Sequence, residues 1–220
     1  MKTRKQILDI ILDDGIVAIV RLKSGKNLVK VVKALHKGGL NVIEITLNTP
    51  DAIEGIRACR MELPDVLMGA GTVLNPKAAG RAIEAGAQFI VSPNTKAAVM
   101  EATHAMGKVS VPGAYTPTEV ALAVDMYADL VKLFPAKGLG PEYIKELMGP
   151  FDDLRIMPTG GVTTRNAKHY LEAGASAVAI GGSMVNDEVV EAGNYKLLTQ
   201  RARAIRKAVD TARKELTKNG

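Results

Sequence analysis

The sequence alternates between short apolar runs and longer segments of helical periodicity, and the alternation repeats eight times. Each apolar run has the length of a β-strand and is followed by a segment whose apolar residues recur at helical spacing. The eight runs are 16–20, 41–47, 66–70, 88–92, 108–111, 130–134, 154–157 and 177–180. Strands that alternate with helices are typical of parallel βα units, so the pattern predicts an α/β protein.

Three of the units share a turn in which a helix ends on small residues and a strand follows. The turn reads HKGGLNVIE at 36–44, EAGAQFIVS at 84–92 and EAGASAVAI at 172–180. We expect its glycine to adopt the positive φ angle that a helix C-terminus requires. Eight units in 220 residues favour a single (β/α)8 TIM barrel over an open doubly wound sheet. The open sheet would also need a G-x-G-x-x-G turn after its first strand, which is missing.

Two helices lie outside this repeat. An amphipathic helix over about 3–13 precedes the first strand, and a long helix over about 194–218 closes the barrel. No linker or low-complexity segment interrupts the pattern, so residues 1–220 are predicted to form one barrel domain with an extra N-terminal helix.

Composition excludes several classes of protein. No apolar run approaches the roughly 20 residues of a membrane helix, and the first residues read as an amphipathic helix rather than a signal peptide. We therefore expect a cytoplasmic protein without a membrane partner. Cys59 is the only cysteine, which excludes an intrachain disulfide, and its place on a predicted helix indicates ordinary packing.

The formal net charge is +6, and many basic residues crowd the last helix. These are Lys196, Arg201, Arg203, Arg206, Lys207, Arg213, Lys214 and Lys218. A nucleic-acid patch is one interpretation. A solvated helix face is favoured, because acidic residues intervene and aromatic residues, at 4%, leave few platforms for base stacking. A positive field that attracts anionic small molecules is a third.

Lys132 stands in the middle of the apolar run 130–134. Strand alternation places Leu130, Lys132 and Phe134 on one face, and Val131 and Leu133 on the other. Burial of the amine would favour its neutral form and make it a nucleophile that can form a Schiff base with a carbonyl. The alternative is a lysine that extends to solvent from a strand end or an edge strand.

In a (β/α)8 barrel the active site lies at the C-terminal ends of the strands, and polar residues or glycines fall there in nearly every unit. In chain order they are Arg21, Glu44, Thr46, Thr72, Ser92, Pro93, Asn94, Pro112, Gly113, Lys132, Phe134, Thr159, Gly160, Gly161, Gly181, Gly182 and Ser183. This common register predicts a site at that end.

Glu44 is the expected partner of Lys132. Alternation along 41–47 places Val42, Glu44 and Thr46 toward the interior, with the aliphatic residues between them facing the helices. A buried carboxylate there could act as a general acid or base, or as a structural counter-ion that keeps the lysine charged. The barrel context favours catalysis.

Two glycine-rich turns follow the seventh and eighth strands, Gly160-Gly161 and Gly181-Gly182-Ser183. Barrels often bind phosphate at these two positions through backbone N–H groups, so the turns predict a site for phosphate or another anion. His36, His104 and His169 are scattered over three units and read as exposed helix residues. We therefore expect no metal site.

Taken together, the motifs resemble those of the class I 2-keto-3-deoxy-6-phosphogluconate (KDPG) aldolase family, which includes 4-hydroxy-2-oxoglutarate (KHG) aldolases. The matching motifs are EITL from Glu44, GAGTV from Gly69, FIVSP from Phe89, PG from Pro112, KLFPA from Lys132, PTGGV from Pro158 and IGGS from Ile180. The resemblance runs in order from about Gly15 to the last helix. It implies a homotrimeric barrel and a lyase that needs no metal and no cofactor.

The resemblance also implies individual roles. Lys132 matches the Schiff-base lysine, and Glu44 matches the acid/base glutamate. The other matches are Thr72, Pro93 and Phe134 around the pyruvyl group, Gly160, Gly161 and Ser183 at the phosphate, and Arg21 as a partner of the substrate carboxylate.

Two positions depart from the family pattern. Asn48 stands where several members have an arginine, and Lys137 where an acidic residue often follows Phe-Pro-Ala. Asparagine cannot clamp a carboxylate with two parallel hydrogen bonds, so Arg21 is expected to take that duty.

The expected activity is cleavage of KDPG, a phosphorylated 2-keto acid, to pyruvate and glyceraldehyde 3-phosphate. The same mechanism on KHG or on 2-keto-3-deoxy-6-phosphogalactonate stays open, since Asn48 leaves the substrate undecided. Two other classes also stay open: a phosphate-binding isomerase or decarboxylase in which Lys132 stays charged, and a non-catalytic basic protein that binds nucleic acid.

Overall fold

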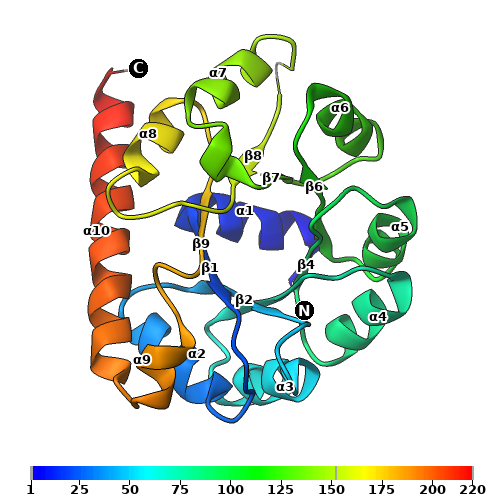
Figure 1. Cartoon of the computed structure of the whole chain (residues 1–220). Helices are drawn as coiled ribbons and strands as arrows, with labels where there is room; N and C mark the ends of the chain where they lie inside the picture. The colour runs from blue at the N-terminus through cyan, green and yellow to red at the C-terminus, as the bar shows by residue number, and fades with distance from the viewer. Residues whose placement is uncertain (1, 152, 220) are drawn as a thin grey trace.

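The computed structural model describes residues 2–151 and 153–219, which form an α/β fold around a curled parallel sheet (Figure 1). The strands are β1 (Ile16–Val20), β2 (Val42–Thr46), β3 (Leu67–Gly71), β4 (Phe89–Val91), β5 (Val109–Val111), β6 (Gly113–Ala114), β7 (Val131–Leu133), β8 (Ile156–Pro158) and β9 (Val178–Ile180). Each of the eight predicted runs contains one of these strands or overlaps it, which confirms the strand prediction.

Helices separate most of the strands. They are α1 (Arg4–Asp14), α2 (Leu28–Lys37), α3 (Ala52–Glu62), α4 (Pro76–Glu84), α5 (Ala97–Ala105), α6 (Pro117–Asp125), α7 (Glu142–Met148), α8 (Ala167–Glu172), α9 (Asp187–Glu191) and α10 (Tyr195–Asn219). A short 3-10 turn, Ala136–Gly138, follows β7. Both helices predicted outside the repeat are confirmed to within one residue at each end. No described helix has the length and apolarity needed to cross a membrane.

All strand pairs are parallel, in a six-stranded order β5-β4-β3-β2-β1-β9 and a three-stranded order β6-β7-β8. Contacts between the sheets include the hydrogen bond from Asp129 N to Ser110 O of β5 at 3.2 Å and a parallel bridge between Thr159 and Ala179. Strand β6 was not predicted. Pro112 separates it from β5 and has no N–H to donate, so pairing stops and restarts around it.

Side chains alternate between two clusters. The cluster on the inner face includes Val17 and Val42 from the strands, Leu130 directly before β7, and Ile7 and Ile11 from α1. The outer cluster packs the opposite strand residues, among them Ile43, Ile45, Val131 and Leu133, against the helices. The predicted orientations of the runs 41–47 and 130–134 are therefore confirmed, and α1 covers the inner cluster at one end of the sheet.

Helix α1 is fixed at both of its ends. A capping box joins Thr3 and Gln6 at the start, and Gly15 ends the helix with a φ of 70° immediately before β1. Arg4 Nε lies 2.8 Å from Asp129 Oδ1, and Asp129 Oδ2 accepts the Ser110 N–H at 2.8 Å. The carboxylate of Asp129 thus connects α1 and β5 to the segment that leads into β7.

The repeated turns adopt the predicted backbone, since Gly39, Gly86 and Gly174 have φ angles of 91°, 112° and 103°. The interpretation of His104 as an exposed helix residue is wrong. Its Nε2 lies 2.7 Å from Ser110 Oγ and 3.5 Å from Asp129 Oδ2, and only 19% of the side chain is exposed. Burial and the nearby Arg4 lower the pKa of His104. His104 therefore belongs to the packing between α5 and β5.

Two glycine substitutions test the packing of the inner face. A Cβ at Gly69 would lie 2.3–2.5 Å from three ring carbons of the fully buried Phe89. We expect Gly69→Ala to lower the free energy of unfolding by about 1–3 kcal/mol, the usual cost of overpacking a core. The matched control is Gly80→Ala in α4, where a Cβ meets nothing within 4 Å.

The control should stabilise the protein by about 0.5–1 kcal/mol, because alanine loses less entropy than glycine in a helix. Urea denaturation of both variants measures the two changes. Equal stabilities would contradict the close contact between Gly69 and Phe89.

Candidate active site

A cavity of about 540 Å³ opens at the C-terminal ends of β1, β7, β8 and β9. Its lining includes nine of the strand-end residues predicted from the sequence: Arg21, Lys132, Phe134, Thr159, Gly160, Gly161, Gly181, Gly182 and Ser183. The common register at the strand ends therefore leads these residues into one cavity. Glu44, Thr72 and Pro93, which were also predicted, lie outside its lining.

Lys132 occupies the centre of β7, where it pairs with Gly113 on one side and Met157 on the other. Only 5% of the residue is exposed, and its Nζ lies 4.7 Å from the centroid of the Phe134 ring. The electron-rich ring face stabilises an ammonium. The amine still reaches the cavity, so it is buried and accessible to a ligand at the same time.

Glu44 lies at the centre of β2 and is 1% exposed. Its Oε2 has no hydrogen-bond partner among the described residues. The carboxylate sits against Gly71, where a Cβ would lie 2.4 Å from Glu44 Oε1. Gly71 thus provides the space for this carboxylate, which is not part of the cavity lining.

Burial shifts the pKa of each group in the direction of its neutral form. Burial raises the pKa of Glu44, against the opposing charges of Lys132 and Arg21. Burial also lowers the pKa of Lys132, a shift that Arg21 strengthens and Glu44 opposes. A neutral amine is a nucleophile, and a carboxylic acid with a raised pKa can exchange a proton near neutral pH.

Arg21 and the two residues that depart from the family pattern, Asn48 and Lys137, differ in their positions relative to the cavity. Arg21 is exposed directly after β1 and lines the cavity, and Lys137 lines it as well. Asn48 is exposed and lies outside the lining. Arg21, rather than Asn48, is therefore placed to contact an anionic group in the cavity.

The predicted anion site has the backbone that it requires. Gly160 and Gly161 have φ angles of 92° and 82°, and Asn166 Nδ2 holds the turn by donating to Gly161 O at 2.9 Å. In the part of the chain that the structure describes, the amides of Gly161 and Gly182 donate to no protein acceptor. Such free N–H groups can bind an anion.

Thr72 and Pro93 lie at the same end of the sheet. Thr72 follows β3 and has a φ of 56°. Pro93 comes after β4 and packs against Gly113, where a Cβ would lie 2.3 Å from the Pro93 carbonyl. Their placement agrees with the predicted register, although neither side chain lines the cavity.

Sequence reasoning missed Asp187 in the cavity lining. Its Oδ1 accepts the Lys23 N–H at 2.7 Å and so joins the start of α9 to the loop after β1. The acidic residue at the start of a helix is visible in the sequence. Its contact with Lys23 is not, because the two residues lie far apart in the chain.

The remaining candidates play no part in the cavity. Cys59 is fully buried, and burial together with Glu62 raises its pKa to about 12, which makes the thiol inert. Among residues 2–151 and 153–219, no group of histidine, cysteine and acidic side chains has the arrangement to hold a metal ion.

Comparisons with known proteins give one consistent result. The sequence profile of the family described as "KDPG and KHG aldolase" matches residues 7–201. The "KHG/KDPG aldolase" of Escherichia coli strain K12 is 38% identical over 206 residues, which cover 92% of this chain and 96% of that protein.

Two solved structures are similar to the whole fold. One, described as "Native KDPGal structure", has a TM-score of 0.84 at 31% identity and covers 90% of this chain and 96% of its own. The other is a KDPG aldolase from Legionella pneumophila with pyruvate captured as a covalent carbinolamine. It has a TM-score of 0.84 at 28% identity, with 91% and 98% covered.

The coupling between Glu44 and Lys132 can be measured through the reactivity of the amine. Glu44→Gln removes a negative charge that favours the ammonium, so the pKa of Lys132 should fall further; Arg21→Ala should raise it. The acetylation rate of Lys132, followed by peptide mass spectrometry across pH, reports this pKa. The exposed Lys214 serves as the internal reference. Identical pH profiles in the three proteins would show that the charges do not interact.

Proposed function

The chain belongs to the KDPG and KHG aldolase family, and we propose that it cleaves KDPG to pyruvate and glyceraldehyde 3-phosphate through a Schiff base on Lys132. The observation that carries this proposal is the buried amine of Lys132, whose pKa burial lowers, at a cavity rimmed by glycine turns. Membership of the family makes the protein an aldolase, a carbon–carbon lyase of class I.

The first step is attack of the neutral Lys132 amine on the C2 ketone of the substrate. The carbinolamine loses water to give an iminium, which can accept an electron pair from the neighbouring carbon. Burial and Arg21 lower the pKa of Lys132, which increases the fraction of the amine in the reactive form. Phe134, whose ring faces Nζ, would border the pyruvyl group.

The second step breaks the C3–C4 bond. Glu44 removes the proton of the C4 hydroxyl, directly or through water, and the electrons of the bond move to the iminium. The aldehyde leaves and an enamine stays on Lys132. Protonation at C3 and hydrolysis of the resulting iminium release pyruvate and restore the amine. A raised pKa allows Glu44 to return the proton within the same cycle.

The glycine turns of the cavity support a phosphorylated substrate. The free amides of Gly161 and Gly182, with Ser183 beside them, would hold the phosphate, and Lys137 adds a positive charge. Binding of this non-reacting group would orient the chain for cleavage. KHG and the galactonate epimer remain alternative substrates, since the E. coli relative is named for both KHG and KDPG and a similar structure for KDPGal.

We also propose that the two sheets close into one (β/α)8 barrel domain over residues 1–220, with α1 as its extra helix. The Asp129–Ser110 hydrogen bond and the Thr159–Ala179 bridge support closure. A homotrimer is proposed from the family resemblance. Sedimentation equilibrium tests it, and a monomeric mass at micromolar concentration would exclude it.

The Schiff base is tested by incubating the protein with pyruvate and sodium borohydride and measuring the intact mass. The wild type should gain a single pyruvyl adduct, and Lys132→Ala should gain none. Lys137→Ala is the matched control, because it removes the other lysine of the same cavity and should keep the adduct. If the wild type gains no adduct, Lys132 stays charged and the isomerase or decarboxylase alternative is favoured.

The role of Arg21 in binding the substrate carboxylate is tested by comparing substitutions of Arg21 and Asn48. Arg21→Ala should lower kcat/KM for KDPG about 10- to 100-fold, because a hydrogen bond to a charged group is worth about 1.5–3 kcal/mol. Asn48→Ala should leave kcat/KM close to the wild-type value. Steady-state assays that couple pyruvate release to lactate dehydrogenase measure both. The reverse order of effects would assign the carboxylate to Asn48.

A further inference from the structure

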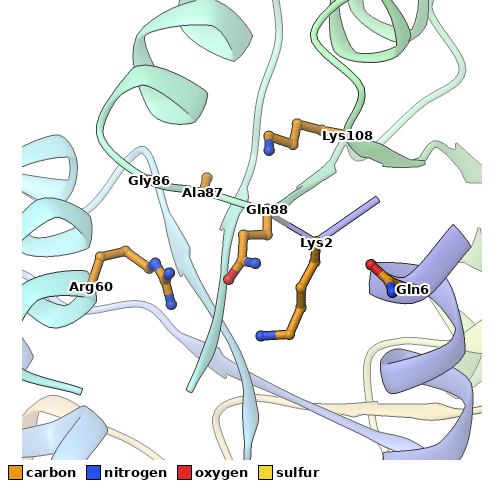
Figure 2. Close-up of a pocket in the computed structure, with 7 residues that line it drawn as sticks. All are labelled: Lys2, Gln6, Arg60, Gly86, Ala87, Gln88 and Lys108. Carbon is orange, nitrogen blue, oxygen red and sulfur yellow. The ribbon is translucent and has the colours of Figure 1, made fainter. Parts of the chain in front are cut away.

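A second cavity, of about 410 Å³, lies at the opposite end of the sheet, beside the residues that lead into β4 and β5. Figure 2 shows its lining side chains, of which Lys2, Arg60 and Lys108 are the longest. The N-terminal face of such a sheet normally serves stability rather than catalysis. The proposed aldolase chemistry uses none of these residues.

The cavity gathers positive charge without any balancing carboxylate. Its lining contains three basic side chains, Lys2, Arg60 and Lys108, and no acidic residue. Within the described parts of the chain, none of the three forms an ion pair with an acidic side chain. Like charges in one hollow repel each other, and a bound anion would relieve that repulsion.

The position of Arg60 is fixed by the backbone around it. Its Nη1 donates to Pro64 O at 3.2 Å and to Val66 O at 3.0 Å. Gly86 leaves room for the arginine stem, because a Cβ on Gly86 would lie 2.6 Å from Arg60 Cγ. The guanidinium therefore points into the cavity from a fixed frame and keeps further N–H groups for a ligand.

Gln88 provides the polar floor. It is 8% exposed, and its backbone N–H is held by Met68 O at 2.7 Å. Its side-chain Oε1 is buried and has no hydrogen-bond partner among the described residues. Leaving a buried acceptor without a donor is costly, so such an atom is expected to have a partner. In Figure 2 the Arg60 and Lys2 side chains extend toward the Gln88 amide from opposite sides.

We propose that this cavity binds a small phosphate monoester that carries a free hydroxyl group. The phosphate would lie among Lys2, Arg60 and Lys108, and the hydroxyl would donate to Gln88 Oε1. A volume of about 410 Å³ is within the range of small-molecule sites, roughly 300–1,000 Å³. The site is separate from the Lys132 cavity and does not depend on the proposed reaction.

The probe is glycerol 2-phosphate, a hydroxylated phosphate monoester without a carbonyl that could react with Lys132. Amide chemical shifts in the ¹⁵N-labelled protein locate the binding, with Gly86 and Ala87 reporting on this cavity and Gly160 and Gly161 on the other. Saturable shifts at Gly86 and Ala87 are expected. Shifts confined to Gly160 and Gly161 would overturn the proposal.

Charge variants test the basic side chains. Lys2→Ala/Lys108→Ala should weaken the response at Gly86 and Ala87 about 10-fold or more, in keeping with the loss of two charged contacts. Lys207→Ala/Lys214→Ala removes the same charge from exposed positions of α10 and should bind as the wild type does. Equal weakening in both double variants would indicate a general charge effect and reject the site.

The role of Gln88 is tested with isopropyl phosphate, which has the same carbon frame as glycerol 2-phosphate and no hydroxyl. The wild type should prefer glycerol 2-phosphate about 5- to 10-fold, the value of one hydrogen bond to a buried acceptor. Gln88→Met keeps the length of the side chain and should remove the preference. If the wild type binds the two probes equally, the hydroxyl contact does not exist.

Discussion

The burial of one amine and one carboxylate inside the same curled sheet is the constraint on which the site depends. Lys132 and Glu44 are 5% and 1% exposed, and desolvation opposes the charged form of each. Removal of two charges from water costs several kcal/mol for each ion. Their mutual attraction and the pull of Arg21 on Glu44 offset part of that cost. The balance leaves Glu44 able to lose a proton and Lys132 able to gain one.

The surrounding fold holds this unfavourable pair through rigid backbone. Asp129, one residue before the run that carries Lys132, receives hydrogen bonds from Arg4 of α1 and from the Ser110 backbone. Gly71 gives Glu44 its space through the lack of a side chain. Stability is therefore provided by the apolar clusters and by contacts such as these, while the site itself is costly. Such a division is common where function needs a buried charge.

Local pattern accounts for what the sequence predicted well. Alternation along β2 and β7 placed Glu44 and Lys132 on the inner face, and the helix-ending turns required positive φ angles at glycines such as Gly86. Contacts between distant segments account for the rest. Strand β6 arises from pairing around Pro112, and His104 is partly buried beside Asp129, which comes 25 residues later in the chain. No local period encodes either.

The distribution of positive charge is likewise set by contacts between distant segments. From the sequence, basic residues concentrate in the last helix, yet the structure gathers cations from separate segments into hollows. The Lys132 cavity adds Arg21 and Lys137, while Lys2, Arg60 and Lys108 meet at the other end of the sheet. Charges that converge on a hollow focus the potential on one small anion. A nucleic acid would instead need cations spaced along a surface to follow successive phosphates. The arrangement of charge, rather than its amount, therefore favours small anionic ligands at both ends of the sheet.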